Sequence, residues 1–100
     1  MSGYSTHVTE DQRLRVLQML ERDAAGSHNA DVLRAGLEAV GHANVSYRRT
    51  RDLLDWLADK GLVAIEDRGT HVIARITEAG EAAALGDAAV PGVARPRRRF

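Results

Sequence analysis

Cysteine is absent from this sequence, which excludes disulfides and thiolate metal sites and fits a reducing cytoplasm. No apolar run approaches the roughly 18 residues of a membrane-spanning helix, and the first ten residues lack the features of a secretory signal. We therefore expect a cytoplasmic protein that does not engage a membrane. One hundred residues support one domain with a single small core.

Signatures of catalysis are also missing. The sequence has no glycine-rich phosphate loop, no nucleophile beside a suitable base, and no carboxylate pair in a pocket-forming fold. The four histidines stand on different predicted elements without the spacing of metal ligands. We therefore expect neither an enzyme nor a protein that holds a metal or another cofactor.

There is no excess charge of either sign, because 14 basic residues balance 14 acidic ones. A protein that binds phosphate usually has a basic excess, so the balance counts against strong non-specific DNA binding. The distribution is uneven, however. Residues 95–100 contain four arginines, and without them ten basic residues face fourteen acidic ones. We interpret the C-terminus as a basic tail on a mildly acidic domain.

The first part of the sequence predicts two helices. Leucines at helical spacing follow Thr9, which can form a capping box with Gln12, and they predict a helix over residues 10–23. Asn29 can cap a second helix over residues 30–40.

The second part predicts four elements in close succession. They are a helix from Tyr47 to Lys60, strands over residues 62–65 and 70–76, and a helix capped by Thr77. A helix followed at once by so small a hairpin is typical of a winged helix-turn-helix.

The predicted fold is therefore an α+β winged helix-turn-helix, with three helices, a two-stranded hairpin wing and a C-terminal helix. We divide the chain into a flexible N-terminus (1–9), the winged helix-turn-helix domain (10–86) and an irregular basic C-terminal tail (87–100).

The residues around the hairpin resemble those of many prokaryotic winged-helix regulators. The helix end has the pattern L-x-x-L-x-x-x-G-L-V up to Val63, and Ile76–Gly80 has the pattern (I/L)-T-E-x-G. A narrower similarity, based on Glu10–Leu14, Gly41–His42 and Val90–Pro96, is to small winged-helix proteins of Mu-like prophages, often described as ArsR-like regulators. This resemblance implies a phage-encoded DNA-binding protein. The cysteine ligands of metal-sensing ArsR proteins have no counterpart here.

The first turn of the predicted third helix carries the candidate base-reading residues. In a winged helix this turn faces the major groove, where arginine can bind guanine bidentately and the helix dipole favours phosphate. The candidates are Ser46, Tyr47, Arg48, Arg49 and Arg51. The alternative is a solvated first turn whose arginines pair with Asp52, Asp55 or acids elsewhere. Asp52, Asp55 and Asp59 also count against DNA binding, because their carboxylates on the same helix would repel phosphate.

The wing and the tail supply further candidates for DNA contact. Arg68 and His71 lie at the wing tip, although the acidic residues beside them favour an ordinary hairpin turn. The tail candidates for phosphate or minor-groove contact are Arg95, Arg97, Arg98 and Arg99. An arginine-rich tail can equally keep the chain in solution or dock on an acidic partner.

Two functions follow from these patterns. The favoured one is sequence-specific binding of double-stranded DNA by a phage transcriptional regulator, with homodimerisation doubling the phosphate contacts. The alternative is a winged-helix adaptor that binds another phage protein during assembly or packaging. The zero net charge and the aspartates of the third helix favour the adaptor, and fold alone does not decide between them.

Overall fold

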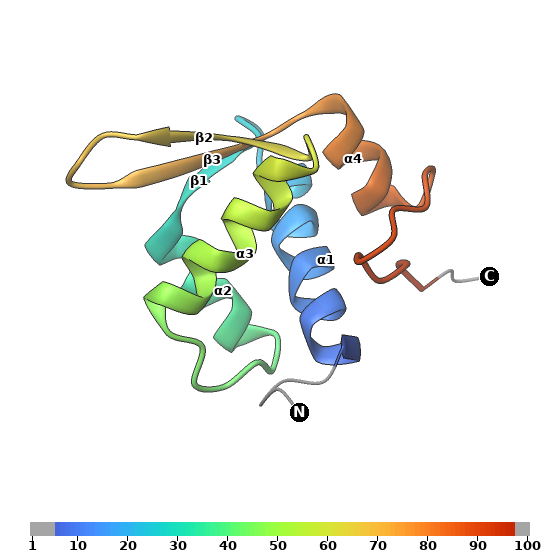
Figure 1. The fold of residues 1–100 in the computed structure, drawn as a ribbon, viewed down its shortest axis with the longest axis horizontal. Helices are drawn as coiled ribbons and strands as arrows, with labels where there is room; N and C mark the ends of the chain where they lie inside the picture. The colour runs from blue at the N-terminus through green and yellow to red at the C-terminus, as the bar shows by residue number, and fades with distance from the viewer. Residues whose placement is uncertain (1–5, 98–100) are drawn as a thin grey trace.

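The computed structural model describes residues 6–97, in which helices pack beside a three-stranded antiparallel sheet (Figure 1). The elements in chain order are α1 (Thr6–Arg22), β1 (Ser27–Asn29), α2 (Ala30–Ala39), α3 (Tyr47–Asp59), β2 (Val63–Asp67), β3 (Val72–Ile76) and α4 (Glu78–Leu85). Three helices, a β-hairpin and a final helix are the order of a winged helix, so the predicted α+β fold class is confirmed. None of the helices within residues 6–97 is long and apolar enough to cross a membrane.

The first helix begins at Thr6 rather than at residue 10. Residues 6–9, which the sequence assigns to a flexible N-terminus, already belong to α1. The predicted capping box is therefore wrong, because Thr9 and Gln12 both lie inside the helix. Gln12 is only 1% exposed and faces α3.

The other helix starts are those that the sequence predicts. The side chains of Asn29, Ser46 and Thr77 each accept a hydrogen bond from a backbone N–H three residues further on, at 2.8, 2.9 and 3.1 Å. Such caps satisfy donors that the first turn of a helix leaves unpaired, each contributing about 1 kcal/mol. Gly61 follows the last turn of α3 with a φ of 74°, which lets the chain reverse directly into β2.

The sheet contains a strand that the sequence does not predict. β1 pairs with β3 in the register Ser27–Arg75 to Asn29–Ile73, so the strand order is β1-β3-β2. β2 and β3 form the hairpin, which projects past the helices as a wing (Figure 1). Residues 70 and 71, predicted as strand, lie in its turn instead.

One apolar cluster holds the helices to the sheet. It includes leucines of α1, α2 and α3, small apolar residues of the sheet and α4, and one residue of the tail; its fully covered leucines are Leu17, Leu20, Leu33, Leu37, Leu53, Leu54 and Leu57. Because α3 buries its leucine face in this cluster, its opposite face is directed to solvent.

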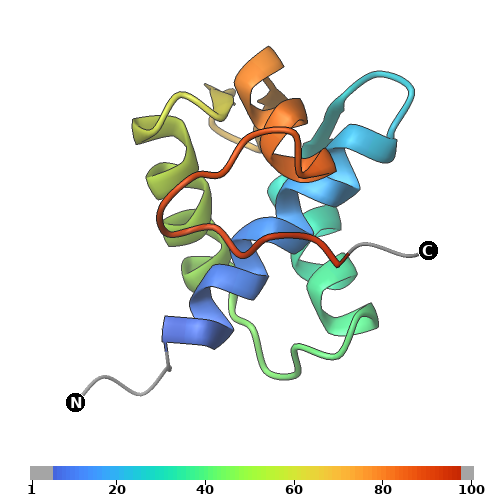
Figure 2. The ribbon, with the colours of Figure 1, turned by 90° about the vertical axis from the view of Figure 1, so that its right-hand side faces the viewer.

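The tail residues 87–97 form neither helix nor strand, yet they pack across α1 (Figure 2). Val93 is 8% exposed and belongs to the core cluster. The backbone N–H of Ala94 donates to the carbonyl of Glu10 at 3.2 Å, and Nη1 of Arg13 donates to the carbonyl of Gly92 at 2.9 Å. This segment is therefore part of the domain.

Arg13 also joins the tail to α3. Its guanidinium lies 3.8 Å from the ring centroid of Trp56, within the range of a cation–π contact. Burial lowers the pKa of Arg13, the positive charge of Arg49 lowers it further, and Glu10 opposes both. Because an arginine pKa starts so high, Arg13 stays charged and continues to hold the tail against α1 and α3.

Candidate nucleic-acid interface

The start of α3 presents two side chains to solvent. Ser46 caps the helix, and Val45, 3% exposed, anchors the preceding loop in the core. Tyr47 is 41% exposed, and Arg48 is exposed as well. Within residues 6–97 the side chain of Arg48 makes neither an ion pair nor a hydrogen bond. Tyr47 and Arg48 are thus placed to meet a ligand, with the positive end of the helix dipole behind them.

Arg49, which the sequence also offers as a base-reading residue, points the other way, toward α1. Its Nη2 donates to Oγ1 of Thr9 at 2.8 Å and to Oε1 of Gln12 at 2.9 Å, and its Nε donates to the same Gln12 oxygen at 3.2 Å. The side chain ties α3 to α1 and supplies the donors that the buried Gln12 oxygen needs. Its physical role is therefore structural.

The Arg49→Met variant should lower the free energy of unfolding by about 1–3 kcal/mol, because it leaves the buried Gln12 carbonyl without a donor. Urea denaturation followed by circular dichroism measures the change. The matched control is Arg48→Met, on the exposed side of the same turn, which should change stability by less than about 0.5 kcal/mol. Equal losses for the two variants would show that Arg49 is not held as described.

The middle of α3 carries mixed charge. Arg51 is partly buried, and its Nη2 lies 4.0 Å from Oδ1 of Asp55, the length of a weak ion pair. Asp52, Asp55 and Asp59 are all exposed. The positive part of this face is therefore limited to the first turn and Arg51, and negative charge increases toward the end of the helix.

The wing tip is more acidic than basic. Nη2 of Arg68 donates to Oε2 of Glu66 at 2.9 Å, with both side chains more than half exposed. Oδ1 of Asp67 accepts from the N–H of Gly69 at 2.9 Å and shapes the turn, while His71 is exposed beside it. A surface pair like Arg68–Glu66 is worth at most about 1 kcal/mol, so a phosphate could replace Glu66 as the partner of Arg68.

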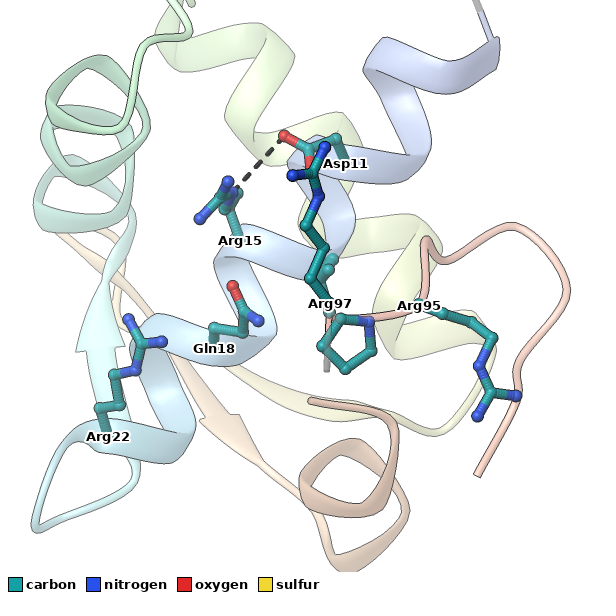
Figure 3. Close-up of a pocket in the computed structure, with 8 residues that line it drawn as sticks. Asp11, Arg15, Gln18, Arg22, Arg95 and Arg97 are labelled. Atoms are coloured by element: carbon teal, nitrogen blue, oxygen red, sulfur yellow. Dashed lines mark ion pairs between the residues drawn. The ribbon is translucent and has the colours of Figure 1, made fainter. Parts of the chain in front are cut away.

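The tail arginines lie apart from these residues. Arg95 donates to the carbonyl of Gly86 at 3.2 Å, and Arg97 extends over α1 toward Asp11 (Figure 3), in a pocket that Arg15 and Arg22 also line. Arg98 and Arg99 fall outside the described residues. The predicted site is therefore divided between the start of α3, the wing tip and the outer side of α1.

Sequence reasoning missed the α1 residues of this third region. Asp11, Arg15, Gln18 and Arg22 recur at intervals of four, three and four, which places them on one face of the helix. Asp11 also accepts from Nε2 of His42 at 2.7 Å, which links α1 to the loop before α3. Among residues 6–97, no three histidine or carboxylate side chains gather as they would around a metal ion.

The fold and the exposed helix start together define an α+β protein of winged-helix-like architecture. No family model matches the sequence. The chain is 43% identical over 93 residues to the uncharacterized protein gp26 of Escherichia phage Mu, and the match covers 92% of this chain and 94% of gp26. The chain belongs to the family of phage Mu gp26, which confirms the predicted relation to Mu-like phages.

Proposed function

We propose that this protein binds double-stranded DNA as a phage transcriptional regulator acting in the bacterial cytoplasm, with the first turn of α3 in the major groove. The observation that carries the proposal is the exposed pair Tyr47 and Arg48 at the capped start of α3. A guanidinium without an internal partner can bind the O6 and N7 atoms of guanine, while the neighbouring phenol reaches a phosphate.

The charge pattern of α3 favours insertion by the helix start. The helix rises about 1.5 Å per residue, so Asp59 lies roughly 17 Å along the axis from Arg48. Asp55 is closer, but its pairing with Arg51 offsets part of its charge. Asp52 has no such partner among the described residues and is the side chain that most opposes this docking.

The Arg48→Gln variant should lose about 5- to 150-fold in affinity for the preferred site, since one bidentate contact to guanine is worth about 1–3 kcal/mol. Fluorescence anisotropy with labelled fragments of the phage's own promoter regions, at low salt, measures the loss. Wild-type protein that binds none of these fragments below micromolar concentration would contradict the proposal.

The matched control is Arg75→Gln. Arg75 is also exposed but lies on β3, where its Nη1 donates to the carbonyl of Ala25 at 3.3 Å. The Arg75→Gln substitution therefore removes the same charge as Arg48→Gln, but from a different part of the surface. A loss of site preference that is as large for Arg75→Gln as for Arg48→Gln would mean that only overall charge matters.

A protein-binding adaptor is the second candidate, and a specific observation favours it. Val32 and Val40 of the α2 region are each 44% exposed, and Tyr47 adds a third exposed large apolar side chain. A phage protein that binds the purified chain, and loses this binding with Val32→Asp or Val40→Asp while DNA affinity is absent, would establish the adaptor instead.

A further inference from the structure

A groove of about 340 Å³ lies between α1 and the tail, and none of the residues that line it belongs to α3. The tail segment that forms one of its walls crosses α1 (Figure 2). Its walls come from the polar face of α1 and from residues 95–97. The contacts of Val93, Gly92 and Ala94 hold the tail in place, so the groove is a formed part of the domain.

Positive charge dominates the groove. Four arginines line it against a single carboxylate, Asp11. That carboxylate is already engaged, since it accepts from His42 at 2.7 Å and lies 3.5 Å from Nε of Arg15. The side chains of Arg22 and Arg97 have no ion pair or hydrogen bond with any residue in the described range 6–97. The groove therefore offers positive charge that the rest of the domain does not neutralise.

The side chains follow the groove as a row. Arg15 and Arg22 lie two turns apart on α1, with the amide of Gln18 between them, and Arg97 extends from the other wall toward the Asp11 end of the row (Figure 3). Arg95 is directed away, toward Gly86. Seven residues of helix correspond to about 10.5 Å, which is the axial length of about three phosphates along one strand of DNA.

We propose that this groove binds the phosphodiester backbone of a nucleic acid, independently of sequence and at a place separate from α3. Phosphate oxygens accept hydrogen bonds from guanidinium groups and from side-chain amides, and the groove offers both. A protein partner would require a buried apolar anchor, and the groove offers only Leu14 and Pro96 as apolar lining. The row of donors instead fits several phosphates in succession.

The proposal goes beyond DNA recognition by α3 and does not need it. One molecule with both sites would hold two backbone segments, or two parts of one bent duplex. Arg48 then governs the preference among sequences, whereas the groove governs affinity for all sequences alike.

The test is the double variant Arg22→Gln/Arg97→Gln of the full chain, with an unrelated 16-bp duplex as the probe in anisotropy titrations from 50 to 300 mM salt. Removing two phosphate contacts should lower affinity at least about tenfold at 50 mM salt and reduce the slope of log K against log salt by about 1.8. The charge-matched control is Arg34→Gln/Arg75→Gln. It should reduce the slope by less than about half as much as the groove variant does.

Three results would overturn the proposal. These are equal slopes for the double variant and its control, wild-type protein that does not bind the duplex at 50 mM salt, and tighter binding of an acidic glutamate peptide than of the duplex. Circular dichroism and Trp56 emission show whether the double variant is folded. If Arg48→Gln leaves site preference unchanged while the groove variant still loses affinity, the α3 proposal fails and the groove proposal stands.

Discussion

Replacing Gly80 by alanine should lower the free energy of unfolding by about 3 kcal/mol, at the upper end of the usual cost of overpacking a core. A Cβ at this position would lie 2.1 Å from the backbone oxygen of Leu62 and 2.8 Å from Cγ1 of Ile76. The oxygen of Leu62 is fixed because it accepts from the N–H of Thr77 at 3.1 Å. The chain between α3 and α4 would have to move, and alanine's better helix propensity, about 1 kcal/mol, does not offset this.

Gly36→Ala is the matched control for this substitution. Gly36 is also inside a helix, and its added Cβ would be equally close, 2.1 Å, to an atom of Met19. That atom is the thioether sulfur of a flexible side chain, which can turn aside. Gly36→Ala should therefore change stability by less than about 1 kcal/mol. Thermal denaturation distinguishes the two, since a loss of 3 kcal/mol lowers Tm by roughly 12–24 °C in a domain of this size.

Val93→Asp should release the tail from α1 and lower the free energy of unfolding by about 2 kcal/mol, close to the contribution of one buried valine. The new carboxylate has no partner in the apolar cluster, so the tail detaches rather than bury it. Trp56 would then lose its contact with Gly92, and its emission should shift to the red.

The control for Val93→Asp is Ala89→Asp, at an exposed position of the same segment, which should change stability by less than about 0.5 kcal/mol. Chemical denaturation monitored by Trp56 fluorescence compares the two variants. If both have the small effect, the tail is a solvated arm, and the groove beside α1 has no fixed wall.

Local sequence signals predicted most of the fold because they depend on neighbours in the chain. Caps at Asn29, Ser46 and Thr77 and the reversal at Gly61 each involve residues within one turn of a helix. β1 was not predicted because its three residues show no alternation of apolar and polar side chains. Its strand pairing comes only from β3, about 46 residues later in the chain.

The candidate site was harder to predict because side-chain direction depends on distant partners. Arg48 and Arg49 are adjacent and chemically identical, yet only Arg49 meets the buried oxygen of Gln12, which belongs to another helix. The tail posed a similar problem. Its irregular backbone was evident from proline and glycine, but docking through Val93 requires the surface that α1 and α3 make together.

The most direct test of DNA recognition by α3 is a selection of bound duplexes from a library with twelve randomised base pairs, done in parallel with wild-type protein and Arg48→Gln. We expect the wild type to enrich a motif that contains an invariant guanine, and Arg48→Gln to lose the preference at that position alone. Enrichment of no motif by the wild type, or of the same motif by both proteins, would contradict the account.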